Sequence, residues 1–188
     1  MSDTVNDIDR RIAARVKHER EGRGLSLAQL AESSGVSKAM ISRIERSEVS
    51  ATAALLGRLS GAFGLTVSDL LSADEGGNAK LRRRAEQQHW KDPATGFTRT
   101  ALSPAAARRL QLVQGELPPR ARIAYPAASY GFFTQQIWVM AGQLVFHEGA
   151  TRHVLEAGDC LELSEPRDCK FENASAKTPC RYLVALSL

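Results

Sequence analysis

Between residues 38 and 45, small and basic residues alternate with apolar residues at a spacing that fits a helix. If this segment is a helix, Ile41 and Ile44 lie on one face and point toward a core. The opposite face then carries Lys38, Ala39, Ser42 and Arg43. Arginine can donate two hydrogen bonds to guanine, lysine can reach a base or a phosphate, and an alanine methyl can contact thymine. We therefore expect this face to enter the major groove of DNA.

Four further side chains beside this segment suit contacts with the DNA backbone. They are the hydroxyls and the guanidinium of Ser26, Ser37, Arg46 and Ser47. Contacts with phosphates set the register of a protein on DNA and do not select its sequence.

The elements that must position these side chains are two short helices joined by a tight turn. Ser26 and Ser37 are good N-caps for helices over residues 27–32 and 38–45. Gly35 permits the reversal between them, and Val36 fills the space between the two helices. The segment 26–47, SLAQLAESSGVSKAMISRIERS, thus predicts a helix-turn-helix. The alternative is a helical hairpin in some other bundle.

This pattern, S-L-x-x-L-A-x-x-x-G-V-S-x-x-x-I-S-x-x-E-x, resembles the phage-repressor or XRE-type helix-turn-helix, over residues 8–71. The resemblance implies a five-helix, lambda-repressor-like DNA-binding domain, with an ion pair between Arg20 and Glu45 that braces the recognition helix. Two positions depart from the family. Ser47 stands where glycine is common, and Leu27 stands where many members carry a glutamine that contacts DNA. We keep Leu27 among the candidate DNA contacts.

From residue 97 onward, short apolar stretches separated by Pro and Gly predict a β-sandwich or barrel. The segments IWVMAGQLVF and VLEAGDCLELSEPRD resemble the two sequence motifs of cupins. The predicted fold class is therefore α+β with two domains, an all-α DNA-binding domain followed by an all-β cupin (double-stranded β-helix) barrel. We place the domains at residues 1–73 and 97–188, with a linker at 74–96.

The cupin resemblance also identifies four positions where cupin enzymes usually hold a metal. In this chain they carry Ser129, Gly131, Gln135 and Cys169. None of these is a standard ligand of the histidine and carboxylate set that such sites need. We therefore expect no metal, no cofactor and no enzymatic activity.

A small barrel without a metal can still hold one small ligand. Carrying over the family positions puts Gln135 inside the barrel, together with Phe133 and Ile137. The candidate ligand-binding set is Ser129, Gly131, Phe133, Gln135, Ile137 and Cys169. For each of them the alternative is a purely structural role in the core. If its thiolate pKa were low, Cys169 would be a redox or electrophile sensor, whereas a packed cysteine would be inert.

Charge and apolar patterning limit the protein's surroundings. The formal net charge is +4, which is only weak support for a polyanionic partner. Basic residues nevertheless cluster in the first predicted helix and its exit, at Arg10, Arg11, Arg15, Lys17, Arg20 and Arg23. There is no apolar run of membrane-spanning length, no secretory signal core and no C-x-x-C pair, so we expect a cytoplasmic protein without a membrane partner.

These observations predict a DNA-binding transcriptional regulator. We expect a homodimer that binds a palindromic operator in double-stranded DNA and a cupin domain that binds a small-molecule effector. Two alternatives remain. One is a cupin isomerase or oxygenase with an appended DNA-binding module, and the other is an antitoxin-like or protein-interaction DNA-binding protein.

Overall fold

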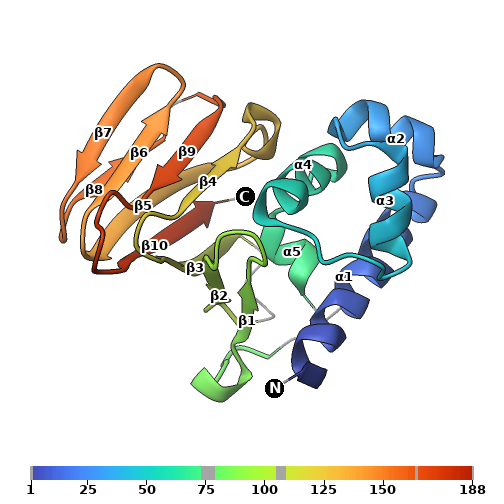
Figure 1. Cartoon of the computed structure of the whole chain (residues 1–188), viewed down its shortest axis with the longest axis horizontal. Helices are drawn as coiled ribbons and strands as arrows, with labels where there is room; N and C mark the ends of the chain where they lie inside the picture. Colours follow the sequence, from blue (N-terminus) through green and yellow to red (C-terminus); the bar gives the residue numbers. More distant parts are fainter. Residues whose placement is uncertain (1, 73–78, 105–108, 164, 188) are drawn as a thin grey trace.

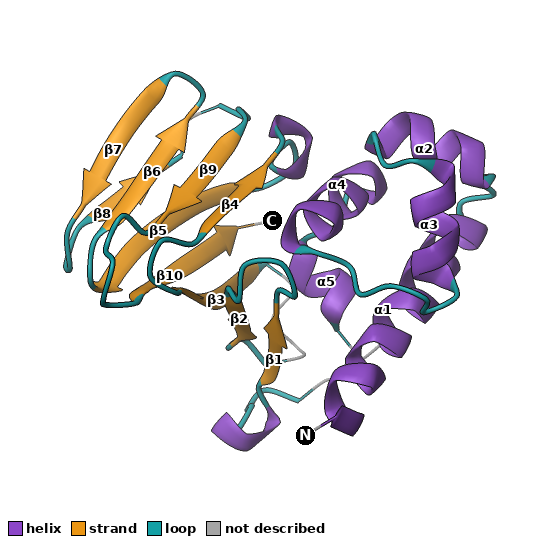
Figure 2. Ribbon diagram, in the orientation of Figure 1, coloured by secondary structure: helices purple, strands orange, loops and turns teal. Residues whose placement is uncertain are grey.

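The computed structural model describes residues 2–72, 79–104, 109–163 and 165–187. Five helices come first and two β-sheets follow (Figures 1 and 2). The helices are α1 (Ser2–Gly22), α2 (Leu27–Ser34), α3 (Lys38–Glu45), α4 (Ala53–Phe63) and α5 (Val67–Leu71). The predicted fold class, five helices followed by an all-β cupin-like region, is confirmed. No helix in the described parts of the chain is both long and apolar enough to cross a membrane.

The predicted caps begin the helices of the helix-turn-helix. The Ser26 hydroxyl accepts a hydrogen bond from the Gln29 N–H at 3.2 Å, and the Gln29 side chain accepts one from the Ser26 N–H at 2.9 Å. The Ser37 hydroxyl accepts from the Met40 N–H at 3.2 Å. Gly35 ends α2 at φ +65°, a conformation that glycine adopts without strain. Val36 is buried between the helices as expected.

In the described part of the chain, ten strands form two antiparallel sheets. Their bounds are β1 (Gln88–Lys91), β2 (Thr98–Ala101), β3 (Leu110–Leu117), β4 (Arg122–Tyr125), β5 (Thr134–Ala141), β6 (Leu144–Glu148), β7 (Thr151–Leu155), β8 (Cys160–Glu162), β9 (Cys169–Glu172) and β10 (Cys180–Ser187). One sheet has the order β1-β2-β3-β10-β5-β8 and the other the order β4-β9-β6-β7. Strands β3 to β10 form the two four-stranded layers of a jelly roll, the architecture of cupins.

The sheet begins earlier than the predicted linker allowed. A short 3-10 helix, η1 (Arg84–Glu86), and strand β1 lie within residues 74–96, where we expected a linker. Strand β1 has the sequence QHWK, and Trp90 is its only buried side chain. A single apolar residue gives no alternating pattern, so the strand is not visible in the sequence. Residues 73–78 lie outside the described parts of the chain.

The helices pack tightly on the jelly roll through α4, which lies against β4 and the short helix η2 (Ala127–Ser129). Two glycines on α4 permit this approach. A Cβ atom at Gly57 would lie 2.4 Å from Cδ1 of Tyr125, and one at Gly61 would lie 2.6 Å from the carbonyl oxygen of Ala128. The Ser129 hydroxyl donates to the Gly57 carbonyl at 2.8 Å.

Polar contacts extend the same junction along α4 and α5. Asp92, in the turn between β1 and β2, accepts a hydrogen bond from the Ala53 N–H at 3.2 Å, at the start of α4. On β3, the Gln111 side-chain amide donates to Asp69 at 3.0 Å and its carbonyl accepts from Thr66 at 2.9 Å. We call the contacts of α4 and α5 with Asp92, Gln111 and residues 125–129 the domain interface.

Candidate DNA interface and barrel cavity

The face of α3 that we predicted to contact DNA is open to solvent. Lys38, Ala39 and Arg43 are exposed and Ser42 is half-buried. On the opposite face Ile41 and Ile44 are 0% and 2% exposed. Figure 1 shows α4 between α3 and the sheets, so the jelly roll does not cover this face.

An ion pair between α1 and α3 holds the recognition helix in place. The Arg20 Nε and Nη2 atoms donate to the two carboxylate oxygens of Glu45 at 2.6 and 3.0 Å, and Nη1 donates to the Leu25 carbonyl at 3.0 Å. The two side chains are only 13% and 8% exposed. The hydrogen bond with Glu45 raises the pKa of Arg20. This is the pair that the family resemblance implied.

The four side chains that we predicted to contact phosphates differ in whether they are exposed and already hydrogen-bonded within the chain. Ser26 and Ser37 are exposed, and their hydroxyls accept the capping hydrogen bonds. The Arg46 guanidinium donates to the Glu48 carboxylate at 2.6 and 3.0 Å and to Ser42 at 2.7 Å, so its charge is compensated within the chain. Ser47 has φ 56°, in the left-handed region that favours glycine. This backbone conformation explains why glycine is common at that position.

Two further features of the DNA-facing surface bear on the expected contacts. Leu27 is partly buried and packs against the helical core, so only part of its side chain is open to a DNA contact. The basic cluster on α1 is largely paired. Arg11 bonds to Asp7 at 3.0 Å, and Glu19 pairs with both Arg15 and Arg23. By contrast, the structure gives Lys38 and Arg43 no ion-pair partner among its described residues.

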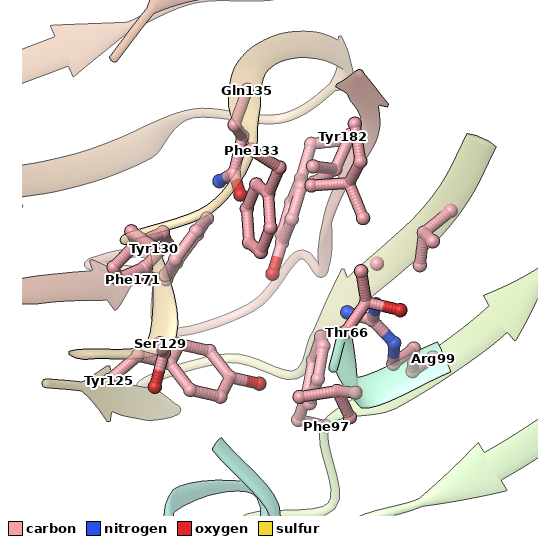
Figure 3. A pocket seen from close by; sticks show the side chains of 15 residues that line it. Thr66, Phe97, Arg99, Tyr125, Ser129, Tyr130, Phe133, Gln135, Phe171 and Tyr182 are labelled. Carbon is pink, nitrogen blue, oxygen red and sulfur yellow. The ribbon is translucent and has the colours of Figure 1, made fainter. Parts of the chain in front are cut away.

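A narrow cavity of about 50 Å³ lies between the two sheets, at the end of the jelly roll that faces α5 (Figure 3). Strands of both sheets line it, with Gln135 and Tyr182 from one and Tyr125 and Phe171 from the other. Thr66 and Val67, at the start of α5, complete the wall. The cavity is therefore shared by the jelly roll and the helical domain.

Arg99, on β2, is the charged residue among those that line the cavity. Its Nη2 atom donates to the Ser68 hydroxyl at 2.9 Å. Its Nε atom is buried and has no hydrogen-bond partner among the described residues. Burial lowers the pKa of Arg99 and raises those of the tyrosines around it, that of Tyr125 to about 12. The tyrosines therefore carry neutral hydroxyls at neutral pH.

Only some of the predicted ligand-binding residues line the cavity. These are Ser129, Phe133 and Gln135. Gly131 lies instead in a shallow surface depression beside Phe132. Ile137 is fully buried in the core, where its β5 neighbour Gln135 reaches the cavity.

Cys169 lies outside the cavity lining and borders a surface hollow with His147 and Asp168. Its thiol donates to the Arg167 carbonyl at 3.3 Å. Burial raises the pKa of the thiol to about 11, which contradicts the low thiolate pKa that a sensor would need. The structure therefore favours the packed, inert cysteine.

Sequence reasoning missed Arg99, Tyr125, Tyr182 and the α5 residues of the cavity. Arg99 sits in the strand TRTA, which has too few apolar residues to be recognised as a strand. An arginine alternating with threonines is the one signal that could have drawn attention to it.

The four positions of the cupin metal site do not form a metal site here. The Ser129 hydroxyl donates to the Gly57 carbonyl, Gly131 offers no side chain, and the Cys169 thiol donates to the Arg167 carbonyl. Among the residues that the structure describes, no cluster of three or more His, Cys, Asp or Glu side chains could hold a metal ion. These donors do not fit the histidine and carboxylate set of the family.

Residues 16–70 match the helix-turn-helix family HTH_3. Over 68 residues the chain is 38% identical to the HTH-type transcriptional regulator SutR of Escherichia coli (strain K12). That match covers 36% of this chain and 38% of the relative, so it spans well under half of the relative's length.

Among solved structures, an HTH_3 family transcriptional regulator from Vibrio cholerae has a similar fold over 97% of this chain and 98% of its own, with a TM-score of 0.79 and 22% identity. An RmlC-like cupin from Shewanella frigidimarina NCIMB 400 aligns with 58% of this chain and 90% of its own, with a TM-score of 0.47 and 15% identity.

Proposed function

We propose that this chain, with an XRE-type helix-turn-helix domain of the HTH_3 family at its N-terminus and a cupin-like β domain after it, is a DNA-binding transcriptional regulator. The observation that carries the proposal is the exposed face of α3. Lys38 and Arg43 are exposed there without ion-pair partners among the described residues, and the Arg20–Glu45 pair fixes the helix that bears them. A fixed, uncovered helix with unpaired cations suits the major groove.

Each side chain has a distinct role in this proposal. Arg43 donates to a guanine, Lys38 reaches a base or phosphate, and Ala39 contacts a thymine methyl. Ser42 lies beside them. Ser26, Ser37 and Ser47 contact phosphates, and Arg46 joins them once Glu48 releases its guanidinium. We place the protein in the cytoplasm.

The DNA-bound form in this proposal is a homodimer on a palindromic operator. A single helix-turn-helix contacts few base pairs. In a two-fold symmetric dimer the second copy makes the same contacts with the other half-site, which doubles the interface with DNA. An effector in the barrel cavity then regulates DNA binding if it has different affinities for the competent and incompetent dimers. The cavity supports this because it is bounded by Thr66 and Val67 of the helical domain as well as by the jelly roll.

We do not favour the two alternatives. A metal-dependent cupin isomerase or oxygenase would need a donor set that positions 129, 131, 135 and 169 do not supply. An antitoxin-like or protein-interaction role would leave the largely apolar, aromatic cavity and its one arginine without a purpose.

Binding of the purified full chain to its own promoter region tests the proposal. Fluorescence anisotropy should show site-selective binding that weakens steeply with salt, because phosphate contacts release counterions. Arg43→Ala should weaken binding by about tenfold or more, since a bidentate contact with guanine contributes about 1–3 kcal/mol. Arg152→Ala, an exposed arginine on β7 far from α3, is the matched control and should bind normally.

Binding that ignores sequence and survives Arg43→Ala unchanged would overturn the proposal. The helix-turn-helix would then be a protein-contact or dimerisation element.

A further inference from the structure

The cavity is lined by a partly buried cation, Arg99, whose fully buried Nε atom has no hydrogen-bond partner among the described residues. No carboxylate among the described residues lies within ion-pair distance of Arg99, whose one side-chain hydrogen bond goes to the neutral Ser68. Asp69 is the acidic residue near Arg99, but its carboxylate accepts hydrogen bonds from the Thr66 N–H and the Gln111 amide and makes no ion pair with Arg99. Removing part of a guanidinium from water is unfavourable unless a partner compensates its charge. A bound anion would supply that partner.

Two neutral tyrosine hydroxyls point into the same space that Arg99 borders. Figure 3 shows the hydroxyls of Tyr125 and Tyr182 directed into the space that Arg99 borders. Neither hydroxyl has a hydrogen-bond partner among the described residues, and burial keeps both protonated by raising their pKa values. Protonated hydroxyls can donate to the oxygens of an anion.

The remaining wall is apolar and mostly aromatic. Phe97, Phe133 and Phe171 contribute their rings, and Val113 and Leu186 add aliphatic side chains. Such a wall excludes water and favours an apolar group on the same ligand. The cavity of about 50 Å³ restricts that group to a compact one.

Charge balance selects the class of anion. Fifteen residues line the cavity, and the guanidinium of Arg99 is the formal charge among them. One positive charge neutralises one negative charge, so a monoanion fits, whereas a phosphate dianion would bring an uncompensated charge into an apolar site. A planar carboxylate also matches the planar geometry of the guanidinium donors.

From these observations we propose that the cavity binds a small organic monocarboxylate, with its carboxylate on Arg99 and the tyrosine hydroxyls and its apolar group against the phenylalanines. This inference rests on the proposed function, because it names the chemical class of the effector. The bound carboxylate would meet both domains, since Arg99 also holds Ser68 of α5 and Thr66 lines the same wall. Ligand binding would thereby act directly on the start of α5.

The test is isothermal titration calorimetry on the full chain at constant ionic strength. Propionate, isobutyrate and benzoate are compared with their neutral amides and with inorganic phosphate. We expect at least one carboxylate to bind about tenfold or more tightly than its amide, with phosphate weaker than that carboxylate. Amides that bind as well as the acids, phosphate that binds more tightly, or no binding by any of the three carboxylates would overturn the proposal.

Substitutions of cavity residues test whether the carboxylate binds in this cavity. Arg99→Gln should reduce carboxylate affinity by about tenfold or more, and Arg181→Gln, an exposed arginine on β10, should leave it unchanged. Because Arg99→Gln also removes a contact with Ser68, Tyr182→Phe serves as a second variant that keeps the ring and should weaken carboxylate binding several-fold. Full carboxylate affinity in both variants would place the site elsewhere.

Promoter binding, measured on the same preparations, separates the two proposals. Selective DNA binding without carboxylate binding would remove the ligand assignment and leave the regulator. Carboxylate binding that depends on Arg99, without selective DNA binding, would support the ligand assignment and overturn the regulator.

Discussion

The exposed face of α3 and the barrel cavity are built in opposite ways. The residues of the α3 face lie within one short segment, and its cations, Lys38 and Arg43, are open to solvent. The cavity is assembled from residues between Thr66 and Leu186, and its cation, Arg99, is partly buried with a fully buried Nε atom. The α3 face is open to a large, charged partner, whereas the cavity can enclose only a small ligand. The domain interface lies between them, so its integrity decides whether either can influence the other.

The largest expected effect comes from breaking the domain interface. Gly61→Ala places a Cβ against the Ala128 backbone, which has no flexible side chain to move aside. We expect the free energy of unfolding to fall by about 3 kcal/mol, at the upper end of overpacking effects, in urea titrations followed by circular dichroism. Gly131→Ala is the control, because nothing lies within 4 Å of its added Cβ, and it should change little. Equal stability of the two variants would mean that α4 does not dock as described.

The second effect concerns the support of α3. Arg20→Met leaves the Glu45 carboxylate nearly buried without its partner, and we expect a loss of about 2 kcal/mol in the free energy of unfolding. Arg46→Met removes an exposed pair with Glu48 and should leave stability nearly unchanged. DNA affinity should fall in both variants, but only Arg20→Met should also lower the melting temperature. A normal melting temperature for Arg20→Met would contradict a bracing role.

The third effect distinguishes the cysteines. Burial raises the pKa values of Cys169 and Cys180 to about 11, so at pH 8 almost none of either thiol is the reactive thiolate. We expect Cys160, which is exposed, to react with 5,5′-dithiobis(2-nitrobenzoate) about tenfold faster or more than the other two. In Cys160→Ser the fast phase should disappear. A fast phase that persists would restore Cys169 as a candidate sensor.

The smallest effect lies at the end of α3. Ser47→Gly relieves the strain of a left-handed backbone, and we expect a gain of about 0.5 kcal/mol in the free energy of unfolding. Ser47→Ala keeps the strain and removes the hydroxyl, so it should give no gain. If both variants are stabilised alike, the hydroxyl is the cause and not the backbone.

The helix-turn-helix could be predicted from the sequence because its determinants are local. Ser26, Gly35 and Ser37 mark the helix ends within a few residues, and helical spacing alone identifies Ile41 and Ile44 as core. The Arg20–Glu45 pair joins distant residues, and only the family resemblance predicted it.

The cavity could be predicted only in part because its determinants are distant in sequence. Family positions correctly placed Gln135 and Phe133 at its wall. Strands β1 and β2 contain too few apolar residues to show a period, so Arg99 had no predicted element to carry it. No local pattern could place Thr66, the N-cap of α5, at the wall of a cavity formed by residues further along the chain.

The bond from Asp92 to the start of α4 has a consequence for protein engineering. The helix that supports the helix-turn-helix obtains part of its N-terminal hydrogen bonding from the first β-turn of the other domain. A chimera joined between α5 and β1 would therefore separate α4 from Asp92, Tyr125 and Ser129 at once. A junction in the loop between α3 and α4 would keep these contacts within one parent, which makes that loop the better place to exchange DNA specificity between regulators of this architecture.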